Sequence, residues 1–389
     1  MNPPRNWGTF LDNFLHRALP DSVRTSLRSF KVHGRNVGAP QVGTTAEAYA
    51  GLILEATAQS LRRQNSAFRV SRVTGGWPDA FLFAGIVDGA LSGRFPELFA
   101  TVNWFLDLLL DGDGQFRVPF TTVDQCMLGQ SLLRLNEQNG SPRLECAIQQ
   151  IADFLTVRHV RSHGGSLPYR QERPRIVLVD TVGMICPFLA AYGRAFGSSE
   201  ALGLAVRQMD EFIEKAIEPR SGLPFHGFDT VTQQPLGPVG WARGTGWLVT
   251  GIACSLQPLR NHDQQAYSRL RLFLDGIIAR LHNLQAKNGC FTWLLNFDSA
   301  SPDASGTAMI GYAALVAAAG GAVSSEVALP VAEAALKGLI TFTRKDGYVE
   351  QGQGECIDVG LYPDVFGPTP WTQGAAAQLA VRMIAETVR

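Results

Sequence analysis

The stretch from Gly240 to Trp247, Gly-Trp-Ala-Arg-Gly-Thr-Gly-Trp, places two indoles and one guanidinium within eight residues. The apolar run 248–256 follows it, and this order predicts a loop that leads into a helix. Indole rings offer flat apolar faces to the C–H surfaces of sugars, and an arginine beside them donates strong hydrogen bonds. We therefore interpret Trp241, Arg243 and Trp247 as a candidate sugar-binding platform, with a buried tryptophan-rich helix start as the alternative.

Two aspartates, Asp124 and Asp180, each open another apolar segment. Aspartate is a preferred N-cap residue, so each of them can simply begin a helix. A pair of carboxyl groups is also what the cleavage of a glycosidic bond requires. Both interpretations stay open until the elements that position these side chains are known.

Apolar residues at three- and four-residue spacing predict helices along almost the whole chain after residue 43. Short strands are expected only at 116–120 and 291–295, and a weak helix signal lies at 10–19. The predicted helices are 44–64, 78–92, 95–111, 121–138, 141–158, 178–196, 198–217, 241–256, 262–286, 303–320, 325–345 and 370–387.

Alternate helices open on unusual residues, at positions 77, 124, 180, 241, 303 and 370. A helix pair that recurs in this way is the signature of a repeat architecture. Six helical hairpins closing into a ring make an all-α fold, the (α/α)6 barrel. We expect 44–389 to form this barrel as a single domain, preceded by an N-terminal extension, 1–43. The alternate helices are rich in Ala, Gly and Leu, as an inner ring buried on all sides requires.

If the inner helices all point the same way, their N-terminal ends meet at one mouth of the barrel. This mouth would collect Trp77, Asp124, Asp180, Trp241, Arg243, Trp247, Asp303, Ser305, Trp371 and Gln373. A carbohydrate site needs flat apolar faces and a few planar polar groups, and helix N-termini favour an anion such as a uronate carboxylate. Each residue also has a structural interpretation, as a helix cap, as inner-ring packing or as the partner of a buried charge.

The composition argues against several other classes of protein. The chain has 34 basic and 34 acidic residues, so its net charge gives no case for nucleic acid or an anionic membrane as a partner. No signal-peptide core or transmembrane run is present, and the six cysteines form no Cys-x-x-Cys pair. We therefore expect a soluble cytoplasmic protein with reduced thiols. Phosphate-binding loops, a His-Glu-x-x-His motif and a Gly-x-Ser-x-Gly elbow are all absent.

The residues at the predicted mouth resemble motifs of the unsaturated uronyl hydrolases, which are the unsaturated glucuronyl and rhamnogalacturonyl hydrolases of glycoside hydrolase families 88 and 105. The stretch 241–247 is similar to their Trp-Ala-Arg-Gly-Asn-Gly-Trp, and 222–227 is similar to their Gly-Leu-x-x-His. Residues 179–189 resemble the helix Asp-Thr-Leu-Phe-Met…Pro-Phe-Leu, 303–309 resemble Glu-Thr-Ser-x-x-Ala-Met, and 371–374 resemble the closing Gln-Gly helix. The resemblance covers most of the chain after about residue 75.

This resemblance implies an (α/α)6 barrel and a hydration reaction. An aspartic acid protonates C4 of a Δ4,5-unsaturated uronate at the non-reducing end of an oligosaccharide left by a polysaccharide lyase. Water then adds at C5, and the hemiketal opens to release the aglycone. By position, Asp180 matches the general acid/base and Asp124 matches the second carboxylate. The predicted substrate-binding residues are Trp241, Arg243, Trp247, His226, Trp77, Tyr169, Ser305 and Trp371. No metal or organic cofactor is implied.

The sequence departs from the family pattern at several positions that line the sugar. Tyr169 stands where the family often has a histidine, and Leu178 stands where it often has an aromatic residue. Asp303 replaces Glu, and Thr245 replaces Asn. Two alternatives therefore stay open. One is an inverting glycosidase on a saturated sugar, whose carboxyl groups must admit a water. The other is a non-catalytic carbohydrate-binding protein of polysaccharide biosynthesis.

Overall fold

The computed structural model describes residues 45–66 and 75–387. This part of the chain forms twelve α-helices, as the apolar spacing predicts: α3 (Ala46–Ser66), α4 (Trp77–Leu91), α5 (Phe99–Leu109), α6 (Leu128–Asn139), α7 (Pro142–Asp153), α8 (Val179–Phe196), α9 (Ser199–Ala216), α10 (Ala242–Leu259), α11 (Gln264–Leu284), α12 (Ala304–Ala319), α13 (Ser325–Thr341) and α14 (Pro370–Thr387). The predicted extension, 1–43, and its helix signal at 10–19 lie outside the described residues.

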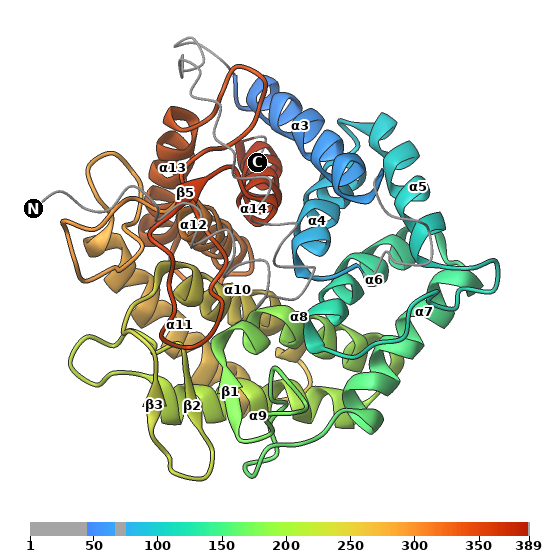
Figure 1. The fold of residues 1–389 in the computed structure, drawn as a ribbon, viewed down its shortest axis with the longest axis horizontal. Coiled ribbons are helices and arrows are strands. Elements are labelled where there is room, and N and C mark those ends of the chain that lie inside the picture. The colour runs from blue at the N-terminus through green and yellow to red at the C-terminus, as the bar shows by residue number, and fades with distance from the viewer. Residues whose placement is uncertain (1–44, 67–74, 388–389) are drawn as a thin grey trace, which may run out of the picture. The chain divides into compact units, whose positions relative to one another are not determined.

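The helices form two concentric rings (Figure 1). In the inner ring, α4, α6, α8, α10, α12 and α14 follow one another, each in contact with the next, and α14 packs against α4 to close the ring. The outer helices pack on inner helices that are their neighbours in the chain, such as α9 on α8 and α13 on α12. This arrangement is the predicted (α/α)6 barrel.

Composition decides which helices lie inside. Helix α12 has no charged side chain and is buried on nearly every side, so it can stand only in the inner ring. Helix α9 instead has one apolar stripe, which buries residues such as Leu204 and Phe212, while its charged residues face outward. Ser198 caps α9 by accepting a hydrogen bond from the backbone N–H of Ala201.

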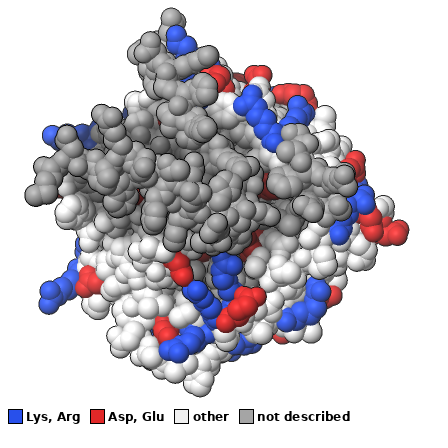
Figure 2. All heavy atoms as spheres, viewed as in Figure 1, with Lys and Arg blue, Asp and Glu red and all other residues white. Residues whose placement is uncertain are grey.

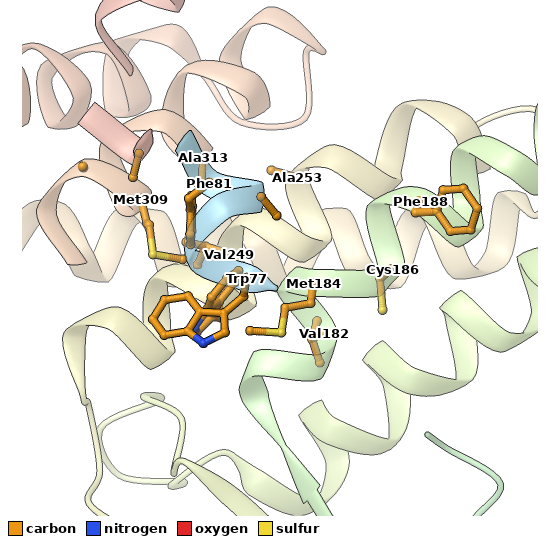
Figure 3. Close-up of a cluster of buried hydrophobic side chains, with 14 of the residues drawn as sticks. Trp77, Phe81, Val182, Met184, Cys186, Phe188, Val249, Ala253, Met309 and Ala313 are labelled. Atoms are coloured by element: carbon orange, nitrogen blue, oxygen red, sulfur yellow. The ribbon is translucent and has the colours of Figure 1, made fainter. Parts of the chain in front are cut away.

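Glycines allow the inner helices to approach one another closely. A Cβ on Gly183 of α8 would lie 2.3 Å from the ring of Trp247 in α10. A Cβ on Gly374 of α14 would lie 2.3 Å from the backbone carbonyl of Phe81 in α4. Figure 3 shows the core that results, in which side chains from α4, α8, α10 and α12 lie close together inside the ring.

The strands of the described part are short. Strands β1 (Ile176–Leu178), β2 (Gly227–Asp229) and β3 (Pro235–Leu236) form one antiparallel sheet in that order, and β4 (Gly352–Gln353) pairs antiparallel with β5 (Phe366–Gly367). The predicted strands at 116–120 and 291–295 are wrong, because these stretches form only isolated bridges. Each stretch pairs with a neighbouring segment at single residues only, as Phe116 does with Leu110 and Thr292 with Pro302.

Three predicted helices consist of two pieces. The short helix η2 (Pro96–Leu98) precedes α5, η3 (Val123–Met127) precedes α6, and a π-helical turn, η4 (Phe154–Arg158), extends α7. Thr122 caps η3, and its side chain and that of Gln125 form a reciprocal capping box. Asp124 therefore lies inside this short helix and is not its cap.

The described part of the chain carries a mixed surface charge and free cysteine thiols. No helix within the described ranges is long and apolar enough to cross a membrane. Acidic and basic side chains are interspersed over the described part of the face in Figure 2. All six cysteines have free thiols.

Candidate active site

The small sheet brings His226 to the start of α8. Strand β1 leads directly into α8, with Leu178 at the N-cap position, so Asp180 is not a cap. Leu178 pairs with Gly227 of β2, and the backbone N–H of Val179 donates to the carbonyl of His226 at 2.8 Å. The His226 side chain consequently lies beside Asp180, with 3.0 Å between Nε2 and the Asp180 Oδ2.

An aromatic group holds the other side of this histidine. The hydroxyl of Tyr362 hydrogen-bonds His226 Nδ1, and the rings of His226 and Trp241 lie 4.6 Å apart. Trp241 is only 2% exposed, and its Nε1 donates to Gln353 Oε1 at 2.8 Å. The Asp180–His226 pair is thus fixed from three elements: α8, the strand that follows His226, and the loop between β4 and β5.

Arg243 ties that loop to the barrel. Its Nη1 and Nη2 donate to the carbonyl oxygens of Gln353 and Gly354, each at 2.9 Å. The guanidinium also lies over the rings of Trp241, at 4.7 Å, and Trp371, at 5.6 Å. Burial lowers the pKa of Arg243, and the nearby carboxylates of Asp303 and Asp180 act in the opposite direction. Both terminal nitrogens of this arginine are therefore committed to the backbone.

Asp303, at the start of α12, binds the backbone at the beginning of the same loop. It is the N-cap of α12, where its carboxylate accepts hydrogen bonds from the backbone N–H groups of Ser305 and Gly306. It also accepts from the backbone N–H of Gln353 at 3.0 Å and from the Ser305 hydroxyl at 2.6 Å. The structural interpretation thus holds for Asp303, and Ser305 belongs to this network, fully buried beneath Arg243.

A cavity of about 80 Å³ lies at the N-terminal ends of the inner helices. It is lined by aromatic, acidic and basic side chains together: Trp77, Tyr169, Arg170, Leu178, Asp180, His226, Trp241, Arg243, Glu355, Cys356, Ile357, Asp358 and Val359. The last five residues come from the loop between β4 and β5. An ion pair between Arg173 and Asp358, at 2.9 Å, fastens this loop across the mouth.

Tyr169 lines the cavity and lies close enough to both predicted carboxylates to be affected by their charges. Burial raises the pKa of Tyr169, and the charges of Asp124 and Asp180 both act in the same direction. Asp124 lies in η3, which packs against α8. Burial also raises the pKa of Asp124, against the effects of a bond with Thr122 and the charge of Arg170. Among the described residues, its Oδ1 is buried without a hydrogen-bond partner, and Asp124 is not one of the residues that line the cavity.

Some predicted residues lie away from this cavity. Trp371 stacks on Trp77, with 4.6 Å between ring centroids, and its Nε1 donates to the Gln353 carbonyl. Gln373 donates to the carbonyl of Gly347 and serves the backbone there. Trp247 packs against core residues and lines a second cavity, of about 410 Å³, toward the C-terminal ends of the inner helices. That cavity holds the Asp88–Arg134 ion pair.

The loop between β4 and β5 brings residues to the site that the sequence analysis missed. Glu355 lines the cavity, and Tyr362 contacts His226. The only signal in the sequence is a Gly-Gln-Gly run at 352–354, which is too common to identify a site. Within the described ranges, no group of three or more His, Cys, Asp or Glu side chains is arranged to hold a metal ion.

Comparison with known proteins gives a consistent result. The family model described as Glycosyl Hydrolase Family 88 matches residues 54–374. The unsaturated rhamnogalacturonyl hydrolase YesR of Bacillus subtilis (strain 168) is 21% identical over 57% of this chain, and the match spans 64% of YesR, less than two thirds of its length. A possible family 105 member from Klebsiella pneumoniae has a similar structure, with a TM-score of 0.79, 19% identity, and coverage of 90% of this chain and 96% of that one. An unsaturated glucuronyl hydrolase from Streptococcus agalactiae has a TM-score of 0.65 and 15% identity, with coverage of 90% and 97%.

Proposed function

Because the chain belongs to Glycosyl Hydrolase Family 88, we propose that it removes a Δ4,5-unsaturated uronate from the non-reducing end of oligosaccharides made by polysaccharide lyases. The observation that carries this proposal is the Asp180–His226 pair, held at the start of α8 in a cavity walled by indoles. A carboxyl group that can carry a proton, set beside flat apolar faces, suits the protonation of a sugar double bond.

The proposed reaction is a hydration in which Asp180 moves the protons. Asp180 donates its proton to C4, and the electron pair of the C4=C5 bond forms the new C–H bond. The positive charge at C5 is shared with the ring oxygen. Water then adds at C5 and gives its proton to the Asp180 carboxylate, which restores the acid. The hemiketal opens by cleavage of the bond from C5 to the ring oxygen, and the resulting hemiacetal at C1 releases the aglycone.

The surrounding residues have supporting roles in this proposal. His226, bonded to Asp180 through Nε2 and to Tyr362 through Nδ1, keeps the carboxyl directed into the cavity. Asp124, whose Oδ1 lacks a partner among the described residues but which does not line the cavity, supports Asp180 as the second carboxylate. Trp77 and Trp241 supply the apolar walls.

Five further predicted residues act beneath or beside the substrate. Arg243 holds the loop that closes the cavity, and Ser305 and Trp371 support Arg243 and that loop. Tyr169 provides a hydroxyl that lines the cavity in place of the family's histidine. Trp247 supports the inner ring from the core.

The experiment measures the loss of C4=C5 absorbance from a panel of lyase-derived unsaturated disaccharides. We expect turnover by the wild type, and a fall of about 10²–10⁴-fold in kcat for Asp180→Asn, which keeps the shape of the side chain but cannot transfer a proton. Turnover of saturated glycosides alone would support an inverting glycosidase instead. Binding without turnover of any glycoside would support the non-catalytic alternative.

A further inference from the structure

The loop between β4 and β5 is held far more firmly than a surface loop requires. Arg243 donates to the carbonyl oxygens of Gln353 and Gly354, and Trp371 Nε1 donates to the Gln353 carbonyl. Asp303 accepts from the Gln353 backbone N–H. Trp241 Nε1 donates to the Gln353 side chain. Buried charged and indole groups from three inner helices thus fix the two residues that come directly before Glu355.

Glu355 is the acidic side chain that this anchoring delivers to the cavity. Glu355 lines the same cavity as Asp180, and a hydrogen-bonding interaction with the Trp77 side chain acts to lower the pKa of its carboxyl group. Among the described residues, no ion pair joins Glu355 to an arginine, and the terminal nitrogens of Arg243 donate to the carbonyl oxygens of Gln353 and Gly354. A carboxylate can accept about four hydrogen bonds, so one indole donor leaves most of its capacity open toward the cavity.

The charged groups around Glu355 come from several elements. Arg243 of α10 and Arg170 of the segment before β1 favour its charged form, whereas Asp124 of η3 disfavours it. Burial is the largest effect, and it raises the pKa of Glu355. A half-buried acid that lines a cavity which must receive a ligand is more consistent with a role toward that ligand than with support of the loop, which the bonds to Gln353 and Gly354 already provide.

We propose that Glu355 is a substrate-contacting residue that determines specificity, by accepting hydrogen bonds from sugar hydroxyl groups and by excluding sugars that carry an anionic substituent at the same place. The inference rests on the proposed function, because it takes the ligand to be the unsaturated oligosaccharide. An ionised carboxylate attracts hydroxyl donors and repels a sulfate or carboxylate group, so one residue affects two classes of substrate in opposite directions.

The test compares wild type with Glu355→Gln on matched unsaturated disaccharides, one unsulfated and one O-sulfated. Glutamine keeps an oxygen that can accept from Trp77 but removes the charge. For Glu355→Gln we expect kcat/KM on the unsulfated substrate to fall about tenfold. The ratio of kcat/KM on the unsulfated substrate to kcat/KM on the sulfated one should fall by more than tenfold. As the pH falls and Glu355 is protonated, the ratio of kcat/KM on the unsulfated substrate to that on the sulfated one should fall in the wild type toward the value of the variant. In the variant this ratio should not change with pH.

The control is Glu350→Gln, which removes another acid from the same segment. Glu350 pairs with Arg344 at 3.4 Å and does not line the cavity, so its kinetics should match those of the wild type. Equal loss on both substrates, or no loss, for Glu355→Gln in an active enzyme would overturn the inference alone. An inactive wild type on every unsaturated substrate would remove the proposed function, and this inference with it.

Discussion

Arg243→Lys tests whether the arginine of the Trp-Ala-Arg motif acts on the protein or on the substrate. The guanidinium makes two charge-assisted bonds of 2.9 Å to adjacent carbonyl oxygens in a buried setting. A single ammonium group can keep one of them. Each such bond contributes about 1.5–3 kcal/mol, and the orphaned carbonyl adds a desolvation cost. The rings of Trp241 and Trp371 can still hold a cation, so their contribution largely persists.

We therefore expect Arg243→Lys to lower the free energy of unfolding by about 3 kcal/mol, and Arg243→Ala by about 5 kcal/mol or more, because alanine leaves both carbonyls without a donor. The midpoint of thermal unfolding, followed by circular dichroism, should fall by roughly 4 °C for the lysine variant, because the unfolding entropy of a chain of this length is roughly 0.8 kcal/mol/K. A matched control is Arg269→Lys. Arg269 pairs with Asp210 at the surface, so weakening this ion pair should change the free energy of unfolding by less than about 0.5 kcal/mol. A lysine variant that melts like the wild type but binds substrate poorly would refute the reasoning, because Arg243 would then act on the ligand.

Three further predictions concern the histidine, the ring and the pH dependence. Tyr362→Phe removes the hydroxyl that holds His226, so kcat/KM should fall about tenfold with little change in melting temperature, and unchanged kinetics would exclude this role. Gly183→Ala places a Cβ 2.3 Å from the indole of Trp247 in α10, so the free energy of unfolding, measured in urea, should fall by about 1–3 kcal/mol or more. The control is Gly276→Ala on outer helix α11, where a Cβ meets nothing within 4 Å, and it should raise the free energy of unfolding by about 0.5–1 kcal/mol. Burial raises the pKa of Asp79 from 3.8 to about 6, so the native state binds more protons than the unfolded state between these pH values. The free energy of unfolding should therefore fall by roughly 2–3 kcal/mol as the pH rises from about 4 to 6. Unfolding curves measured at several pH values should lose this part of the pH dependence in Asp79→Asn.

The helices and their closure into a ring could be predicted because both depend on local pattern. The apolar spacing of each segment identifies a helix, and the low charge of segments such as 304–319 identifies the inner ring. Once the alternate helices are parallel, Asp180 and Trp241 must come to the same end of the barrel. The mouth therefore followed from topology without knowledge of any contact.

The contacts at the mouth could not be predicted because they depend on backbone atoms and on a loop with no distinctive pattern. The partners of Arg243 are two backbone carbonyl oxygens more than one hundred residues away. Every residue has such an oxygen, so the sequence does not indicate which ones accept. Trp241 lines the cavity and Trp247 faces the core because Trp241 is the N-cap before α10 and Trp247 lies within the helix, and the sequence alone does not place the boundary between them. Glu355 and Tyr362 reach the site because the strands at 352–353 and 366–367 pair and because side chains of the inner ring bind Gln353 and Gly354.

The most direct test of the central claim follows the reaction in D₂O by NMR with an unsaturated uronyl disaccharide as substrate. Hydration through Asp180 predicts that the first product molecules carry one deuteron at C4, with a single stereochemistry, and lack the vinylic hydrogen signal of C4. Preformed product incubated in the same buffer measures any non-enzymatic exchange, and Asp180→Asn should slow deuteration and release of the aglycone together, by about 10²-fold or more. Release of a uronate that still carries its vinylic hydrogen at early times would contradict the account, because the glycosidic bond would then have been cleaved by direct displacement.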